Sequence, residues 1–255
     1  MLSDLELREV FHFCFLEQLL KISDPNIYIL KGGVNLRFYF KSPRYSEDMD
    51  IDVLAGNVET LKKNGYKILH DDSFIRKLKT YGIQNLLIND PSKAKQTETT
   101  QRFRFRIVNQ SGDQLATKIE FSRRNKESKY YSHELERIDT EIGEKYHRLS
   151  YLAQHYDANT AILQKIEALA GRKEVQARDA FDIFILDIGG HTKNFCSKSI
   201  SKEILAKAQE ALLSISYQDY EGKVLEFLTL EDREDFTGQT IWAEIQKRVM
   251  SLINI

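Results

Sequence analysis

The feature that most restricts the possible fold is a run of acidic residues that alternate with apolar ones. Asp48, Asp50 and Asp52 are separated by Met49 and Ile51. A period of two is typical of a β-strand, and it places the three carboxylates on one face. Like charges on one face repel, so the pattern calls for a counter-ion, and carboxylate oxygens are ligands that Mg²⁺ and Mn²⁺ prefer. The alternative is an exposed acidic strand edge.

A strand–turn–helix unit is predicted just before these acids. The apolar run Ile27–Leu30 leads into Lys31-Gly32-Gly33, and Val34–Phe40 has the pattern of a short helix. Two glycines allow a sharp turn and a close approach to a bound group. The unpaired N–H groups at the start of a helix can hold a phosphate. We therefore expect a phosphate-binding turn here, although an ordinary strand–helix turn has the same signature.

A β-hairpin is predicted farther along the chain. Residues Arg102–Val108 alternate basic and apolar side chains, 109–113 has the composition of a turn, and Gln114–Phe121 forms the returning strand. Glu120 on that strand is a candidate third metal ligand. Two metals held by three carboxylates would clamp the attacking and leaving oxygens of a phosphoryl transfer. Alternatively, Glu120 is an ordinary solvated strand residue.

Local charge around this hairpin points to an anionic substrate. The formal net charge of the whole chain is only −1, but residues 93–126 hold nine basic and three acidic residues. A basic surface beside an acidic metal site suits a polyphosphate or an RNA, and a solvated charged hairpin is the alternative. The nine basic residues are Lys93, Lys95, Arg102, Arg104, Arg106, Lys118, Arg123, Arg124 and Lys126.

Length and periodicity predict two domains. The 255 residues divide into a mixed α/β domain over 1–150 and an all-helical domain over 151–255, where the pattern becomes helical from Asp157 onwards. Residues 67–101 show no assignable pattern. The helices expected at the two ends of the chain are Ser3–Leu20, capped by Ser3 with Glu6, and Asp232–Ile253.

Composition excludes several classes of protein. Cys14 and Cys196 are too few for a disulfide framework or a zinc site. The N-terminal MLSDLELREV has acids where a signal peptide is basic. No apolar stretch reaches the roughly 18 residues needed to span a bilayer. We expect a cytoplasmic protein that makes no contact with a membrane.

Two blocks of the sequence resemble a known family. Gly32-Gly33, fourteen further residues and then Asp48-Met49-Asp50 resemble the first motif of the polymerase-β-like nucleotidyltransferase superfamily. The fuller string LKGGVNLRFYFKSPRYSEDMDIDV is similar to one branch, the AbiEii-type toxins of toxin–antitoxin and abortive-infection systems. A second block of that branch is matched within 162–187 by Lys165-Ile166-Glu167-Ala168-Leu169, Arg172, Arg178-Asp179 and Asp182.

The resemblance implies a fold and a set of site residues. The fold would be an α/β (α+β) polymerase-β-like core with a mixed sheet, followed by a C-terminal helical bundle. In the first block, Gly32 and Gly33 would hold the nucleoside triphosphate, and Asp48 and Asp50 would be catalytic and bind metal. Glu120 would be the third acid, where the family often has Asp.

The second block would act from the helical domain, across a cleft. Lys165 would contact phosphate, Asp179 would be a further catalytic carboxylate, and Arg172 would help to bind the nucleotide. These three residues are spaced by seven, which places them on one side only if the helices run on. The expected stop at Gly171 weakens that geometry.

The function implied is transfer of a nucleotidyl group from an NTP to an acceptor, with Mg²⁺ or Mn²⁺ as cofactor. The expected acceptor is RNA, such as the 3′ end of tRNA, and the protein would be a toxin with a cognate antitoxin partner. A small-molecule nucleotidyltransferase similar to antibiotic-modifying enzymes is the first alternative. A non-catalytic relative that binds nucleotide or RNA, or only another protein, is the second.

Overall fold

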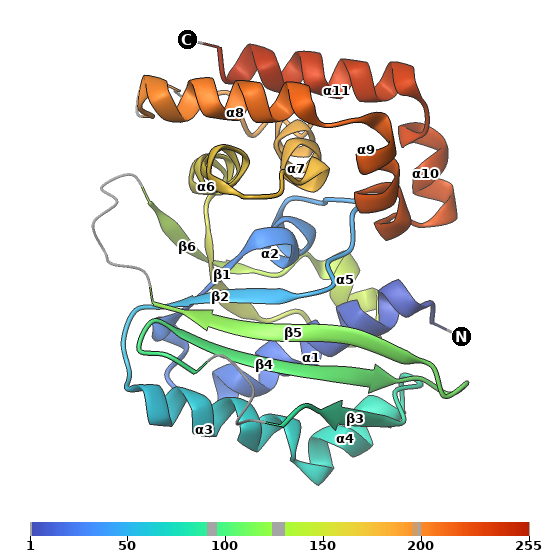
Figure 1. Ribbon diagram of the computed structural model, residues 1–255. Coiled ribbons are helices and arrows are strands. Elements are labelled where there is room, and N and C mark those ends of the chain that lie inside the picture. Colours follow the sequence, from blue (N-terminus) through green and yellow to red (C-terminus); the bar gives the residue numbers. More distant parts are fainter. Residues whose placement is uncertain (1, 91–95, 124–130, 196, 198–199, 255) are drawn as a thin grey trace. The chain divides into compact units, whose positions relative to one another are not determined.

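The computed structural model describes residues 2–90, 96–123, 131–195, 197 and 200–254 (Figure 1). Contacts divide the chain into two units. The sheet unit comprises Met1–Tyr39, Tyr45–Lys129 and His133–His155, and the helical unit comprises Phe40–Arg44, Tyr130–Ser132 and Tyr156–Ile255. The helical unit therefore includes two short segments that precede its main body in the sequence.

The sheet unit is built on one seven-stranded mixed sheet with the order β3-β4-β5-β2-β1-β7-β6. Strand β2 pairs with β1 in antiparallel and with β5 in parallel orientation, so the strand of alternating acids is internal. The mixed sheet confirms the fold class expected from the sequence. The strands are β1 (Tyr28–Lys31), β2 (Met49–Val53), β3 (Asn85–Ile88), β4 (Thr100–Val108), β5 (Gln114–Ser122), β6 (His133–Arg137) and β7 (Leu152–Tyr156).

Helices cover both faces of this sheet (Figure 1). Helix α1 (Asp4–Ile22) begins with the predicted capping box of Ser3 and Glu6. It lies on one face with α3 (Val58–Leu69) and α4 (Asp72–Lys79), whereas α2 (Gly32–Tyr39) lies on the other. The apolar side chains of β4 point towards α3, because a Cβ added at Gly65 would lie 2.3 Å from the ring of Phe103. The alternating basic side chains of β4 therefore point to the opposite face.

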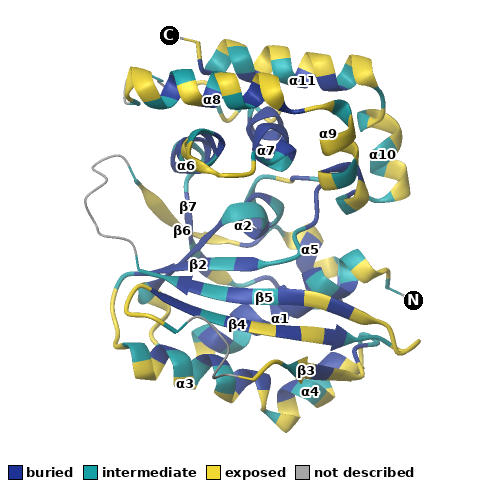
Figure 2. Ribbon diagram, in the orientation of Figure 1, coloured by how far each residue is buried: buried dark blue, intermediate teal, exposed yellow. Residues whose placement is uncertain are grey.

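The helical unit is built around α7 (Ala177–Ile188), which is buried along most of its length (Figure 2). It packs against α6 (Ala158–Gly171), α9 (Tyr217–Lys223) and α11 (Gln239–Leu252). Helix α8 (Lys202–Ser214) packs on α6, and α10 (Leu230–Phe236) precedes α11. The N-cap residues Asp157 and Ser201 accept hydrogen bonds from the backbone N–H groups of Thr160 and Ile204, respectively.

Several elements differ from the sequence-based expectation. The helix predicted over Asp232–Ile253 is two helices, because Gly238 adopts a φ of 118° that breaks the run. The region 67–101 contains α4 and β3, and α5 (Thr140–Lys145), β6 and β7 were not expected. These elements are short, and apart from β3 they contain many polar residues, so periodicity alone does not reveal them. In the part of the chain that the structure describes, no helix is both long and apolar enough to cross a membrane.

Candidate active site

Strand β2 and the residues before it place two of the predicted carboxylates. The hydroxyl of Ser46 donates a 2.8 Å hydrogen bond to the carbonyl oxygen of Asp48, just before the strand begins. Asp50 lies within the strand, opposite Lys31 of β1 on one side and Glu120 of β5 on the other. The three strands therefore bring Asp50 and Glu120 to the same level of the sheet, as the sequence predicts.

The glycine turn lies directly beside Asp50. Gly32 is the first residue of α2 and has a φ of 68°, a conformation that side chains other than glycine disfavour. A Cβ at this position would lie 3.3 Å from Oδ2 of Asp50. The glycine thus allows the start of α2, with its unpaired N–H groups, to approach this carboxylate closely.

The three aspartates of the acidic run have different partners. Asp48 accepts a 3.1 Å hydrogen bond from the backbone N–H of Lys118, whose ammonium lies 2.5 Å from the carboxylate. Asp52 is buried and forms an ion pair with Lys31. Asp50 is half-buried and has no hydrogen-bond or ion-pair partner among the described residues. Of the three, Asp50 is therefore the carboxylate most in need of a cation.

Glu120 is already paired. Nε and Nη2 of Arg102, its neighbour across β4 and β5, both lie 2.6 Å from one of its carboxylate oxygens. Within the described ranges, no three His, Cys, Asp or Glu side chains are grouped closely enough to hold a metal ion. The hard oxygen donors of Asp48 and Asp50 suit Mg²⁺ or Mn²⁺, and Glu120 as a third ligand stays a prediction.

The second predicted block forms a buried ionic cluster in the helical unit. Nζ of Lys165 lies 3.0 Å from Asp179 and 2.5 Å from Asp182. Arg172 contacts the other oxygen of Asp179 at 2.8 Å, and Arg44 binds both oxygens of Asp182, at 3.0 and 2.9 Å. Helix α6 ends at Gly171, so the turn between α6 and α7 brings these residues together, and not one continuous helix.

Cations surround the two carboxylates of this cluster. Arg44 and Lys165 contact Asp182, and Lys165 and Arg172 contact Asp179. Burial opposes ionisation of Asp182, but Arg44 and Lys165 outweigh it and lower its pKa below the usual value. The Arg172 side chain is 40% exposed, so it is the cation of the cluster that a dissolved anion can reach most easily.

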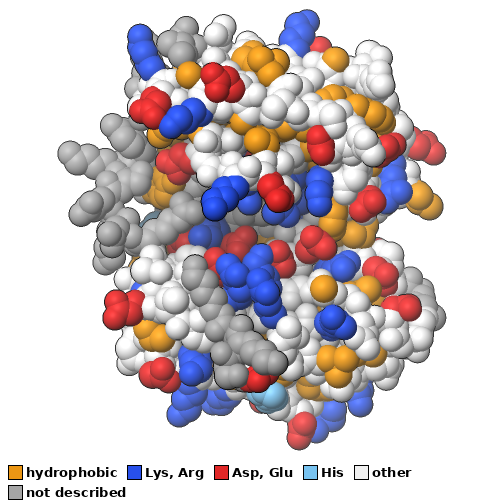
Figure 3. All heavy atoms as spheres, viewed as in Figure 1, with side chains coloured by type: hydrophobic (Ala, Val, Ile, Leu, Met, Phe, Trp, Pro, Cys, Tyr) orange, Lys and Arg blue, Asp and Glu red, His pale blue; other side chains and the backbone are white. Residues whose placement is uncertain are grey.

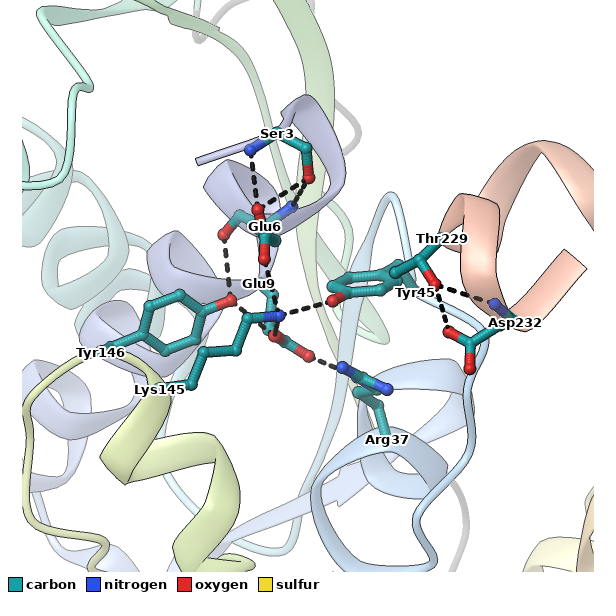
Figure 4. A network of polar contacts seen from close by, with 9 residues as sticks. All are labelled: Ser3, Glu6, Glu9, Arg37, Tyr45, Lys145, Tyr146, Thr229 and Asp232. Carbon is teal, nitrogen blue, oxygen red and sulfur yellow. Dashed lines mark hydrogen bonds and ion pairs between the residues drawn. The ribbon is translucent and has the colours of Figure 1, made fainter. Parts of the chain in front are cut away.

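A second buried network holds α2 and the segment that leads to Asp48 (Figure 4). Glu9 of α1 is 3% exposed and is bound by Arg37 of α2 and by the hydroxyl of Tyr146, both at 2.5 Å. Lys145 joins it to Tyr45, whose hydroxyl lies 2.5 Å from the ammonium. This network was not predicted from the sequence, although one signal was available: Glu9 is an acid just before the apolar run of the first helix.

The basic residues of the hairpin are not equivalent. Arg102 is paired with Glu120, whereas Arg104 and Arg106 are exposed. Lys93, Lys95, Arg124 and Lys126 lie outside the described residues, as does Cys196, while Cys14 is buried and free. Figure 3 shows Lys and Arg side chains over the sheet unit with acidic side chains beside them.

Comparison with known proteins identifies the family. Residues 14–252 match the model of the family described as "Nucleotidyl transferase AbiEii toxin, Type IV TA system". The chain belongs to this family. It is therefore a nucleotidyltransferase toxin of the toxin–antitoxin type, as the two sequence blocks indicate. No curated protein matches it significantly.

Solved structures show the same fold at low sequence identity. MenT4, a nucleotidyltransferase toxin from Mycobacterium tuberculosis H37Rv, is 14% identical with a TM-score of 0.66, over 98% of this chain and 84% of that one. JHP933 from Helicobacter pylori is 18% identical with a TM-score of 0.50, over 99% and 95%. A putative nucleotidyltransferase from H. pylori is 17% identical with a TM-score of 0.51, over 99% and 97%. At these identities the likeness concerns the fold alone.

Proposed function

We propose that this protein transfers a nucleotidyl group from an NTP to an RNA acceptor, such as the 3′ end of tRNA, with Asp48 and Asp50 holding Mg²⁺ or Mn²⁺. One observation carries the proposal above the others. The unpaired carboxylate of Asp50 lies on an internal strand, directly against the glycine that begins α2. Carboxylates for a cation and N–H groups for a phosphate therefore lie side by side, which is what an NTP with its divalent cation requires.

Each predicted site residue of the sheet unit has a role in this proposal. The backbone of Gly32 and Gly33 binds the triphosphate at the start of α2. Asp48 and Asp50 hold the metal, which supplies charge neutralisation at the phosphate when it is bound. Glu120 stands beside them as the third acid, and it must first be released from Arg102 if it is to bind metal.

The helical unit contributes the other residues. The partly exposed guanidinium of Arg172, which shares Asp179 with Lys165, supports a role for these two cations in binding the NTP phosphates. Asp179 keeps Lys165 and Arg172 in place through one oxygen each, and we assign it to the catalytic set as the further carboxylate.

The acceptor and the partner are the finer parts of the proposal. The exposed Arg104 and Arg106 favour an anionic acceptor, so RNA is preferred over a small molecule that resembles a cationic antibiotic. A cognate antitoxin is the proposed partner. The unpaired Asp50 argues against a non-catalytic relative, because a protein without a cation ligand gains nothing from an unpaired half-buried carboxylate.

Label transfer tests this function. The protein is incubated with each labelled NTP, Mg²⁺ and total RNA, and the label in RNA is measured. Asp48→Asn and Asp50→Asn should each reduce the transfer by at least about a hundredfold, because each removes charge that holds the cation. Asp72→Asn, an exposed aspartate of α4, is the matched control and should transfer at the wild-type rate. Wild-type transfer by Asp50→Asn would place the metal site elsewhere.

A further inference from the structure

A pocket of about 260 Å³ lies in the sheet unit beside Asp48. Its lining includes Glu47 and Asp48 from the segment before β2, Asn89 after β3, and Arg104, Arg106 and Lys118 from the hairpin. The three cations exceed the two carboxylates by one charge. The lining of the pocket thus has a net positive charge, and it includes Asp48, one of the two carboxylates proposed to bind metal.

Two cations of this pocket repel each other when no anion is bound. Arg104 and Lys118 stand directly opposite each other on β4 and β5. Like charges in this position destabilise a sheet unless an anion lies between or beside them. Lys118 has Asp48 as its partner, but the side chain of Arg104 has no hydrogen-bond or ion-pair partner among the described residues. An unpaired arginine fork is a donor suited to two oxygens of a phosphate.

Arg102 provides an internal comparison. It lies on the same face of β4, two residues before Arg104, but its guanidinium is bound to Glu120. Arg106 makes only a 2.9 Å contact with the amide oxygen of Gln114 among its described contacts. Of the three arginines on β4, Arg104 is therefore the one whose guanidinium is free to bind an anion, and it lines the pocket.

The strand order separates this pocket from the glycine turn. Gly32 follows β1, the acids lie on β2, and the pocket lies on β5 and β4. Neighbouring strands are about 4.8 Å apart, so β1 and β4 are separated by roughly 14 Å. The carboxylates thus lie between two features that attract anions, and a nucleotidyl transfer to RNA uses two anionic substrates.

We propose that this pocket binds a backbone phosphate of the acceptor, with Arg104 as its main ligand, while the NTP phosphates bind at the start of α2. This inference rests on the proposed function, since it assigns the two anion sites to the two substrates. It predicts an acceptor with a phosphodiester backbone. A polycationic acceptor would be repelled by the same three side chains.

Salt-dependent RNA binding tests the assignment. A fluorescent single-stranded oligoribonucleotide is titrated with the full chain in Mg²⁺ buffer without NTP, at several salt concentrations. Arg104→Gln should weaken binding by about tenfold and reduce the slope of log K against log salt by about 0.7, the value for one phosphate contact on a single strand. Lys63→Gln is the control, because Lys63 is exposed on α3, which covers the opposite face of the sheet. This control should keep the wild-type slope.

Two results would overturn the inference. An unchanged slope in Arg104→Gln would show that no phosphate contact is made in the pocket. If Arg104→Gln instead abolishes the rise in Tm caused by Mg²⁺ and NTP without RNA, the pocket holds the NTP. Neither result depends on label transfer, so the outcome is separate from that of the proposed function. Loss of transfer in Asp50→Asn together with normal RNA binding would leave the pocket assignment standing.

Discussion

Three aspartates with the same spacing in the sequence differ in their surroundings. Asp52 forms an ion pair with Lys31, and Asp48 forms one with Lys118. Asp50 lies beside Gly32, and its carboxylate has no partner among the described residues. The alternation correctly predicts that Asp50 and Asp52 lie on one strand, because periodicity is a local property, but Asp48 lies just before that strand begins. It does not predict their partners, which come from β1 and β5. Arg44 and Asp182 were likewise not predicted as a pair, since 138 positions separate them.

The Lys165 side chain can be tested on its own. Lys165→Ala should reduce label transfer by about a hundredfold, by analogy with the loss of one preorganised charge-stabilising group. It should also destabilise the fold by up to about 3 kcal/mol, because a buried cation between two carboxylates is removed. Arg172 and Arg44 still pair with those carboxylates and limit this loss. Lys165→Arg should restore transfer only in part, because guanidinium is larger and planar.

Transfer by these variants should be measured well below their Tm, beside a melting curve. Lys207→Ala, an exposed lysine of α8, is the control and should change neither quantity appreciably. Wild-type transfer by a folded Lys165→Ala protein would show that the helical unit does not contribute this group to the reaction.

At the scale of elements, the sequence predicts best those parts whose signals are local. The strand–glycine–helix unit, the hairpin of β4 and β5 and the capped helices α1 and α6 all appear where expected. Strand β7 was not predicted because it is short, and its place in the sheet depends on its pairing with β1, which is far away in the sequence, and on its neighbour β6. The ends of α10 and α11 depend on one glycine with a positive φ, and residue type alone does not give that angle.

The packing of α3 on β4 can be tested by adding one methyl group. Gly65 lies against the ring of Phe103, with 2.3 Å between the ring and an added Cβ. Gly65→Ala should therefore destabilise the protein by about 1–3 kcal/mol through overpacking. Gly222→Ala in α9 is the control, since nothing lies within 4 Å of its added Cβ. Alanine there should stabilise the protein by about 0.5–1 kcal/mol. Denaturant unfolding of both variants measures the difference, and equal stabilities would contradict the packing.

At the scale of the whole molecule, the sequence predicts the class of fold but not how the chain is distributed. Periodicity reports the change from a mixed region to a helical region near residue 150. It does not report that Phe40–Arg44, between α2 and β2, belongs to the helical unit. Arg44 of this segment pairs with Asp182 in α7, and no local pattern contains such a long-range pair.

Ligand binding should be visible in the stability of the whole protein. Mg²⁺ with NTP should raise the Tm, because a ligand that binds only the folded state stabilises it by mass action, by about 2.7 kcal/mol at a hundred times its Kd. The double variant Asp48→Asn, Asp50→Asn should lose this rise. Asp72→Asn should keep it. If the rise in Tm persists in the double variant, Asp48 and Asp50 do not hold the metal.

The ion pair between Arg44 and Asp182 also limits when this cluster can form during synthesis on the ribosome. The arginine is made 138 residues before the aspartate that binds Nε and Nη2 of its guanidinium. At 5–20 residues per second, this interval lasts roughly 7 to 28 s. Asp179 is made shortly before Asp182, so Lys165 also lacks both of its carboxylate partners when it is synthesised. A nascent chain can therefore complete this cluster only after Asp182 has been synthesised.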